Sequence, residues 1–248
     1  MPYKPIHDPG RSTNPLAVRR FSKGAAITAL AFSTIAMTSA QADGPGRGQT
    51  AQFERDYLTF IIDHHYSALR ITELAAGTDP QRDAPIDNPD EGTSPTPSTG
   101  ATPPKAGVDA IKSMARMANR MQREEIAKAQ KFLRDWYGVN HTPRLSAEGQ
   151  QQIQLLENTP GGAQFEQAFL QTFSNHHYAA LMPSLDCQVK LDLEHHQLKD
   201  YCDGIVHNQV REIGEMRDML CKQFGVCDYQ PMGGTSGASG ATVSSMRQ

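Results

Sequence analysis

The apolar positions of this chain recur every three or four residues over several long stretches, the spacing of one face of an α-helix. This pattern predicts helices over residues 53–76, 109–137 and 194–224. Another helix is predicted to begin at Phe165, and we expect it to bend or end at Pro183, because proline lacks the N–H that a helix interior uses. The chain is therefore predicted to be all-α.

Short signals beside these stretches predict where helices begin and end. Gly138 can adopt the left-handed conformation that ends a helix, and Ser146 can cap a short helix that runs to Glu157. The residues expected to face the core are, helix by helix, Phe53, Tyr57, Phe60, His64, Ala68 and Ile71; Ile111, Ala115, Ala118, Gln122, Ile126, Ala129 and Leu133; Phe165, Phe169, His176 and Ala180; and Cys202, Ile205, Gln209, Ile213, Met216 and Leu220.

The first and third long helices share one sequence pattern. Residues 53–69 and 165–181 align without a gap at an offset of 112, and a histidine doublet followed by tyrosine falls at the same place in both. The first histidine of a doublet lies on the inner face, and the second lies about 100° round the helix, at the edge of that face. The doublets are His64-His65 and His176-His177.

The second and fourth long helices are also related. Residues 122–138 match residues 209–225 at an offset of 87, so the chain holds two copies of one helical hairpin. The difference between the offsets leaves 25 extra residues between the helices of the first copy. Two hairpins with one apolar face each bury those faces against one another, which predicts a pseudo-symmetric four-helix bundle.

The domain organisation follows from these repeats. The bundle is expected over residues 43–227, with repeat one at 53–138 and repeat two at 165–227. The prolines, glycines and small polar residues of 77–107 predict a disordered insertion, and residues 228–248 predict a disordered tail.

Residues 1–42 are typical of a signal peptide. Basic residues precede an apolar run, and Ala40-Gln41-Ala42 supplies a small-x-small cleavage pattern. The run is shorter than the roughly 20 residues of a membrane span, so we expect no stable span after cleavage. The sequence therefore predicts a periplasmic or secreted protein.

The charge balance argues against nucleic-acid binding. The chain has 24 lysines and arginines and 27 aspartates and glutamates; without residues 1–42 the counts become 19 and 26, a net charge of −7. Nucleic-acid binding depends on basic residues that neutralise phosphates, whereas an acidic exported protein suits cations.

All four cysteines lie in the second repeat, and in an exported protein they favour disulfides over thiolate metal sites. Four cysteines allow three pairings. The expected pairing is Cys187–Cys202, which would join two helices across their short loop, with Cys221–Cys227 after the last helix.

The histidine doublets are the main candidate for chemistry. Neutral imidazoles in a bundle core can hold a metal ion, and nearby thioethers favour copper. The same histidines could instead be hydrogen-bonded core residues, and the methionines could be packing residues. The neighbouring pair His195-His196 is expected on the surface. The candidate metal ligands are His64, His65, His176, His177, Met182, Met216, Met117 and Met121.

Two alternatives belong to other functional classes. A di-iron or copper oxidase of four-helix type would need inward glutamates on all four helices and E-x-x-H on two of them. The sequence has no E-x-x-H; Glu125 and Glu212 are matched, but the first helix of each copy shows no inward glutamate partner. We therefore expect no catalytic residues and no cofactor other than copper. The second alternative is a structural bundle that binds an envelope partner.

The doublets, the two Q-x-x-E-I motifs and the flanking cysteines resemble an exported bacterial family, domain of unknown function 305 (DUF305), which includes CopM-like copper-binding proteins. The resemblance spans about residues 53–227 apart from the insertion, and implies a ferritin-like bundle that binds copper through the doublets. Methionines usual in the family are replaced by Ile71, Ala129 and Pro183, whereas Met216 is kept and Met182 is close enough to compensate for Pro183.

The sequence as a whole predicts an exported, non-enzymatic protein that binds a transition metal, most simply copper, in copper tolerance or storage. The metal ion is the expected partner, and the sequence leaves a homo-oligomer open.

Overall fold

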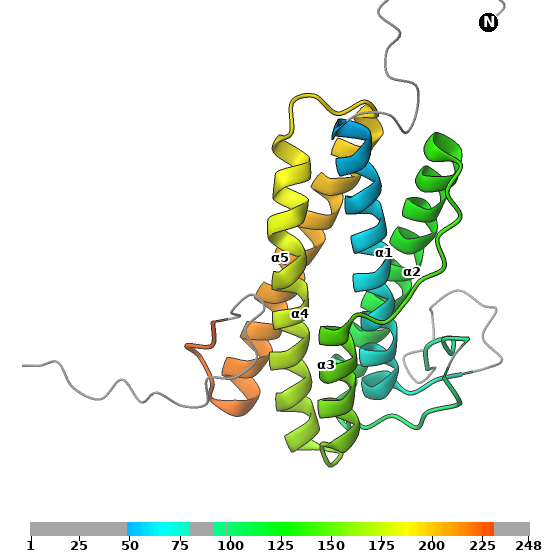
Figure 1. Cartoon of the computed structure of the whole chain (residues 1–248). Helices are drawn as coiled ribbons and strands as arrows, with labels where there is room; N and C mark the ends of the chain where they lie inside the picture. Colours follow the sequence, from blue (N-terminus) through cyan, green and yellow to red (C-terminus); the bar gives the residue numbers. More distant parts are fainter. Residues whose placement is uncertain (1–48, 80–91, 98, 231–248) are drawn as a thin grey trace, which may run out of the picture. The chain divides into compact units, whose positions relative to one another are not determined.

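A computed structural model of the chain describes residues 49–79, 92–97 and 99–230 (Figure 1). The predicted signal peptide, residues 80–91 of the insertion and most of the predicted tail lie outside the described residues. Across the described part the secondary structure is helical, and the β-pairing found there is an isolated bridge between Thr78 and Thr93. The helices are α1 (Gln49–Ala76), α2 (Asp109–Tyr137), α3 (Ala147–Asn158), α4 (Ala163–Val189) and α5 (His196–Phe224).

The helix ends follow the predicted signals. Gly138 ends α2 with a φ of 64°, and Gly225 ends α5 in the same left-handed conformation with a φ of 69°. The Ser146 hydroxyl accepts a 2.9 Å hydrogen bond from the Gly149 N–H at the start of α3. These local signals were readable from sequence because they depend only on neighbouring residues.

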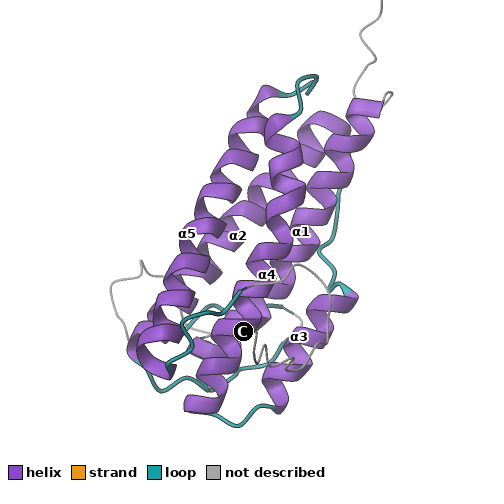
Figure 2. Cartoon of the chain, turned by 90° about the vertical axis from the view of Figure 1, so that its left-hand side faces the viewer, coloured by secondary structure: helices purple, strands orange, loops and turns teal. Residues whose placement is uncertain are grey.

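The helices form an all-α bundle, as predicted. Helix α1 packs against α2 and helix α4 against α5, so each repeat is a hairpin, and the hairpins meet where α1 contacts α4. The four long helices run alongside one another, and the short α3 lies against α1 and α4 (Figure 2). None of the described helices combines the length and apolar composition needed to cross a membrane.

The apolar core consists of two clusters, one toward each end of the bundle. One cluster draws on the later part of α1, the early parts of α2 and α4, and the later part of α5. The other draws on the opposite ends of the same four helices. The middle turns between the clusters contain buried polar side chains, so a polar layer divides the core. We call this set the histidine layer; its members are His64, His65, Gln122, Glu125, His176, His177, Gln209 and Glu212.

The single-face prediction for α1 is only partly correct. Phe60, expected inside, is 36 % exposed, whereas His65, expected at the edge of the face, is fully buried. Helix α1 is covered by α2, α3 and α4 together, so most of its circumference is buried.

The alternative that the third long helix ends early at Pro183 is wrong, whereas a bend at that residue stays a prediction. Helix α4 continues to Val189. The residues after the proline are fixed to the rest of the bundle: the Ser184 hydroxyl lies 3.0 Å from the Tyr57 hydroxyl, and Cys187 is disulfide-bonded to α5. These contacts offset the missing N–H.

Both predicted disulfides are confirmed. Cys187 is bonded to Cys202, with 6.0 Å between their Cα atoms, and Cys221 is bonded to Cys227, with 4.1 Å between theirs. The described residues contain no free cysteine.

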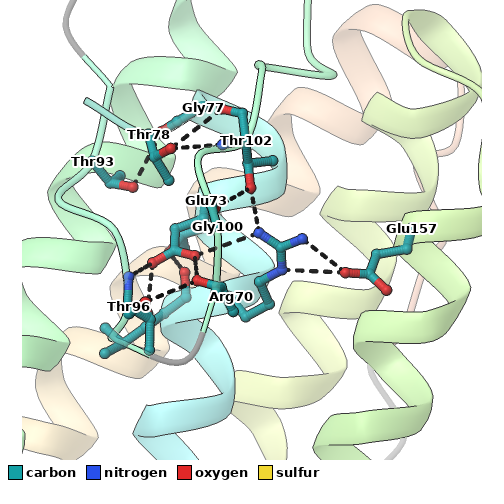
Figure 3. Close-up of polar contacts among 12 residues, drawn as sticks. Arg70, Glu73, Gly77, Thr78, Thr93, Thr96, Gly100, Thr102 and Glu157 are labelled. Carbon is teal, nitrogen blue, oxygen red and sulfur yellow. Dashed lines mark hydrogen bonds and ion pairs between the residues drawn. The ribbon is translucent and has the colours of Figure 1, made fainter. Parts of the chain in front are cut away.

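The described part of the insertion is not the disordered segment that its composition predicted. Thr96 lies against the buried carboxylate of Glu73 (Figure 3), and the N–H groups of Lys105 and Ala106 donate to the backbone oxygens of Leu74 and Ala75 at the end of α1. That carboxylate accepts hydrogen bonds from the Thr96 N–H (2.6 Å) and the Thr99 hydroxyl (3.0 Å). Arg70 lies beside it and donates to Glu157 of α3 and to Thr102. Polar side chains can therefore be buried here because one carboxylate satisfies several donors.

Candidate functional site

The histidine layer is centred on two stacked imidazoles. The rings of His64 and His176 lie face to face, with centroids 3.8 Å apart and planes 10° apart. The Nε2 atom of His64 lies 3.0 Å from the backbone oxygen of His176. Because the two residues are equivalent in the repeats, their mutual contact lies where a pseudo-two-fold axis relating the hairpins would pass.

The second histidine of each doublet faces the glutamate of the matched second motif. His177 Nε2 lies 2.5 Å from Glu212 Oε2, within the second repeat. Within the first repeat, His65 Nε2 lies 3.0 Å from Glu125 Oε2, although this contact does not have the geometry of a hydrogen bond. Equivalent residues thus make equivalent contacts in the two hairpins.

Burial keeps the stacked imidazoles neutral. It lowers the pKa of His64 to about 3, and the neighbouring rings of His65 and His177 act in the same direction. Burial, followed by the neighbouring histidines, also lowers the pKa of His176 well below its ordinary value. Neutral imidazole is the form that can bind a metal ion.

Several buried polar atoms of the layer have no hydrogen-bond partner. His176 donates through its Nδ1–H to the Gln152 amide oxygen of α3 (2.8 Å), but its Nε2 has no hydrogen-bond partner. A buried polar atom without a partner costs about 1–3 kcal/mol, so such atoms are uncommon away from functional sites. The others in the layer are both ring nitrogens of His65, His177 Nδ1, both amide atoms of Gln122 and Gln209 Oε1.

The candidate methionines do not join these histidines. The side chains of Met117 and Met182 are 52 % and 62 % exposed, whereas the histidines are buried. Met216 is buried in an apolar cluster beside Ile213 and Leu220. Met121 is partly buried, and its sulfur lies 3.9 Å from Arg211 Nη2. The structure therefore assembles the predicted imidazoles without the predicted sulfur atoms.

The layer suits a metal ion in donor chemistry, but its side chains are not arranged around one. Four imidazole nitrogens without a hydrogen bond are ligands that copper and zinc accept. Over the described ranges, however, no three histidine, cysteine, aspartate or glutamate side chains converge on a position that could hold a metal ion. Binding would therefore require a change in the ring orientations, and the His–Glu contacts are the ones such a change would alter.

Two buried glutamates that sequence reasoning missed connect the hairpins. Glu54 of α1 accepts hydrogen bonds from the N–H groups of Glu194 (2.7 Å) and His195 (3.1 Å), at the start of α5. Glu166 of α4 accepts from the N–H groups of Gly107 (2.7 Å) and Val108 (2.8 Å), at the start of α2. Each hairpin thus supplies a carboxylate to the helix start of the other. The sequence feature that could have revealed these glutamates is the Phe-Glu pair at the start of both aligned stretches, 53–69 and 165–181.

His195 is part of this contact and is not the surface residue that was predicted. Its Nδ1 lies 2.7 Å from Glu54 Oε2, and its ring stacks on Trp136 with centroids 4.1 Å apart. The Tyr137 hydroxyl also donates to Glu54. His196, its neighbour, is exposed as expected.

Comparison with known families matches residues 100–220 to the family described as domain of unknown function (DUF305). No curated protein and no solved structure matches the chain. The matched residues cover α2, α3, α4 and most of α5, and they include the second doublet, both Q-x-x-E-I motifs and Cys187–Cys202. Through residues 100–220, this chain belongs to the DUF305 family.

Proposed function

We propose that this protein is an exported, non-enzymatic binder of a transition metal, copper in the first instance, with a role in copper tolerance or storage like that of CopM-like members of the family. The observation that carries the proposal is the histidine layer. It holds four buried imidazoles, of which the two stacked rings are neutral at pH 7, and four of the ring nitrogens lack a hydrogen-bond partner.

The disulfides support the exported location. Two disulfides in one domain are characteristic of proteins in an oxidising compartment, because cytosolic thiols are kept reduced. Periplasmic or secreted placement therefore forms part of the proposal.

A structural bundle is the second candidate, and a specific observation favours it. Several imidazole atoms of the layer already have partners inside the protein, such as His64 Nε2 with the His176 carbonyl and His177 Nε2 with Glu212. An oxidase is less well supported, because Glu125 and Glu212 each face a histidine within their own hairpin.

Metal analysis of the full mature protein distinguishes these functions. Purified protein is titrated with copper, freed of unbound ions and analysed for bound metal, alongside a His65→Gln/His177→Gln variant and a His196→Gln control. We expect a defined copper stoichiometry in the wild type and the control and a loss of at least half of it in the doublet variant. Binding of Cu(II) should weaken as the solution is acidified, because protons compete with the metal ion for the imidazole nitrogens.

Three results would contradict the proposal. A wild type that binds no copper above the background of a denatured sample would leave the structural bundle. Copper that is retained in the doublet variant would place the site elsewhere in the chain. Bound iron with oxygen consumption would favour the oxidase. Far-UV circular dichroism and thermal unfolding of each variant show whether it has kept the fold.

A further inference from the structure

A pocket of about 260 Å³ lies between α2 and α5, beside the histidine layer. Acidic residues contribute to its lining from both helices, together with Met121. Lys128 is also present, with its ammonium over the rings of Phe132 and Tyr201. The lining residues used below are Met121, Glu124, Glu125, Asp200, Gly204 and Asn208.

Glu125 joins this pocket to the buried layer. Its side chain is 14 % exposed, and its Oε2 lies 3.0 Å from Nε2 of His65, which is fully buried. Its Oε1 accepts a hydrogen bond from Asn208 Nδ2 (3.2 Å), another residue of the lining. Neither ring nitrogen of His65 makes a hydrogen bond. A buried imidazole that makes no hydrogen bond thus faces a carboxylate that is accessible from the pocket.

The place related to this pocket by the repeat, beside Glu212, is occupied differently. Arg211 stands where the first repeat has Glu124, and its guanidinium lies 3.3 Å from Glu212 Oε1. Met117 stands where the second repeat has Gly204. Glu212 is therefore neutralised by an arginine and is only 5 % exposed, whereas Glu125 faces a pocket that a glycine leaves open.

We propose that this pocket is the path by which the metal ion reaches the histidine layer, and that Glu125 receives the ion and transfers it to His65. The inference rests on the proposed function. The lining contains three acidic residues, Glu124, Glu125 and Asp200, and one basic residue, Lys128. Glu124 also forms an ion pair with Arg120. Such a lining attracts a hydrated cation. The path leads to Glu125 and His65 of the first repeat, although the methionines usual in the family are better preserved in the second.

Two glycines of α5 provide a matched test. A Cβ atom at Gly204 or at Gly214 meets nothing within 4 Å, and leucine is a better helix former than glycine, so both positions accept leucine. Gly204 lines the pocket, whereas Gly214 lies on the exposed surface of the same helix. Gly204→Leu therefore places a side chain in the path, and Gly214→Leu is its control.

The experiment measures how fast the full mature protein takes up copper in a stopped-flow instrument and how much it holds at equilibrium. We expect Gly204→Leu to slow uptake by at least about tenfold, in the range of electrostatic and access effects on association, with the final stoichiometry unchanged. Glu125→Gln should also slow uptake, and Gly214→Leu should match the wild type.

Uptake at the wild-type rate in Gly204→Leu would show that copper reaches the layer by another path, and so would equal slowing in both leucine variants. Either result would overturn the path while leaving copper binding itself intact. A wild type that binds no copper would remove the proposed function and this inference with it.

Discussion

At the scale of single residues, the stacked pair His64 and His176 shows what repetition alone can and cannot reveal. The repeat identified both residues as inward-facing candidates for metal binding, and they do lie together at the centre of the bundle. The partners of the second histidines were not foreseen. Glu125 and His65 each lie at the edge of a helical face, and only the packing of α1 on α2 brings the two edges together.

The lowered pKa values of His64 and His176 predict that acid destabilises the metal-free protein. Above pH 6.5 both residues are neutral in the folded and unfolded states. Between pH 6.5 and about 3 the unfolded chain binds protons that folded His64 does not. The free energy of unfolding should therefore fall as pH falls through this window, by up to about 2.7 kcal/mol per pH unit for the two residues.

Urea unfolding at several pH values between 4.5 and 7.5 measures this slope, within the window that the reference pKa values define. A His64→Gln/His176→Gln variant should show a shallower slope, and His196→Gln, at an exposed position, should keep that of the wild type. Equal slopes in all three proteins would contradict the assignment.

At the scale of helices, the starts of α2 and α5 depend on carboxylates from the opposite hairpin. Helix starts carry unsatisfied N–H groups and partial positive charge, which carboxylates stabilise. The side chains of Val108 and His195, which precede α2 and α5, make no such cap themselves.

Glu54→Gln should therefore loosen the start of α5, and Glu166→Gln the start of α2, because each change removes the charge that the N–H groups face. We expect each to lower the free energy of unfolding by about 1–3 kcal/mol. Hydrogen exchange resolved by residue tests the crossed pattern: faster exchange should appear in the helix of the other hairpin. Effects confined to the mutated helix would disprove the crossed contact.

The two disulfides should differ in their contribution to stability. Cys187–Cys202 spans 15 residues and Cys221–Cys227 spans 6, and loop-closure entropy grows with that length. Replacing each pair by alanine should cost about 3 kcal/mol for the first and about 2 kcal/mol for the second. Urea unfolding of the two double variants gives the comparison, and a larger loss from the shorter loop would contradict it.

At the scale of the whole molecule, the sequence predicted the all-α bundle, its two hairpins and both disulfides, because helical periodicity, repetition and the positions of the cysteines are visible without knowledge of tertiary contacts. Its failures depend on distant contacts. The composition of the insertion could not show that Glu73 satisfies the donors of Thr96 and Thr99. Nor could Pro183 show that Ser184 and Cys187 hold the helix beyond it.

The hairpins should unfold together. The single tryptophan, Trp136 of α2, stacks on His195 of the other repeat and so reports directly on their contact. Its fluorescence and the far-UV circular dichroism should give the same urea midpoint, as a two-state transition requires. A fluorescence change at lower urea would show that the hairpins separate before the helices melt.

The crossed carboxylates have a consequence for how such a chain can arise. A contact in which each half offers the other the same group is the contact that two identical subunits make about a two-fold axis. A single hairpin has a glutamate near the start of its first helix and free N–H groups at the start of its second helix. It is thus complementary to a second copy of itself. Joining two copies in one chain, here through residues 139–162, replaces an association that depends on protein concentration with an intramolecular one. After such a fusion the two copies can diverge, as Arg211 has from Glu124 and Met117 from Gly204.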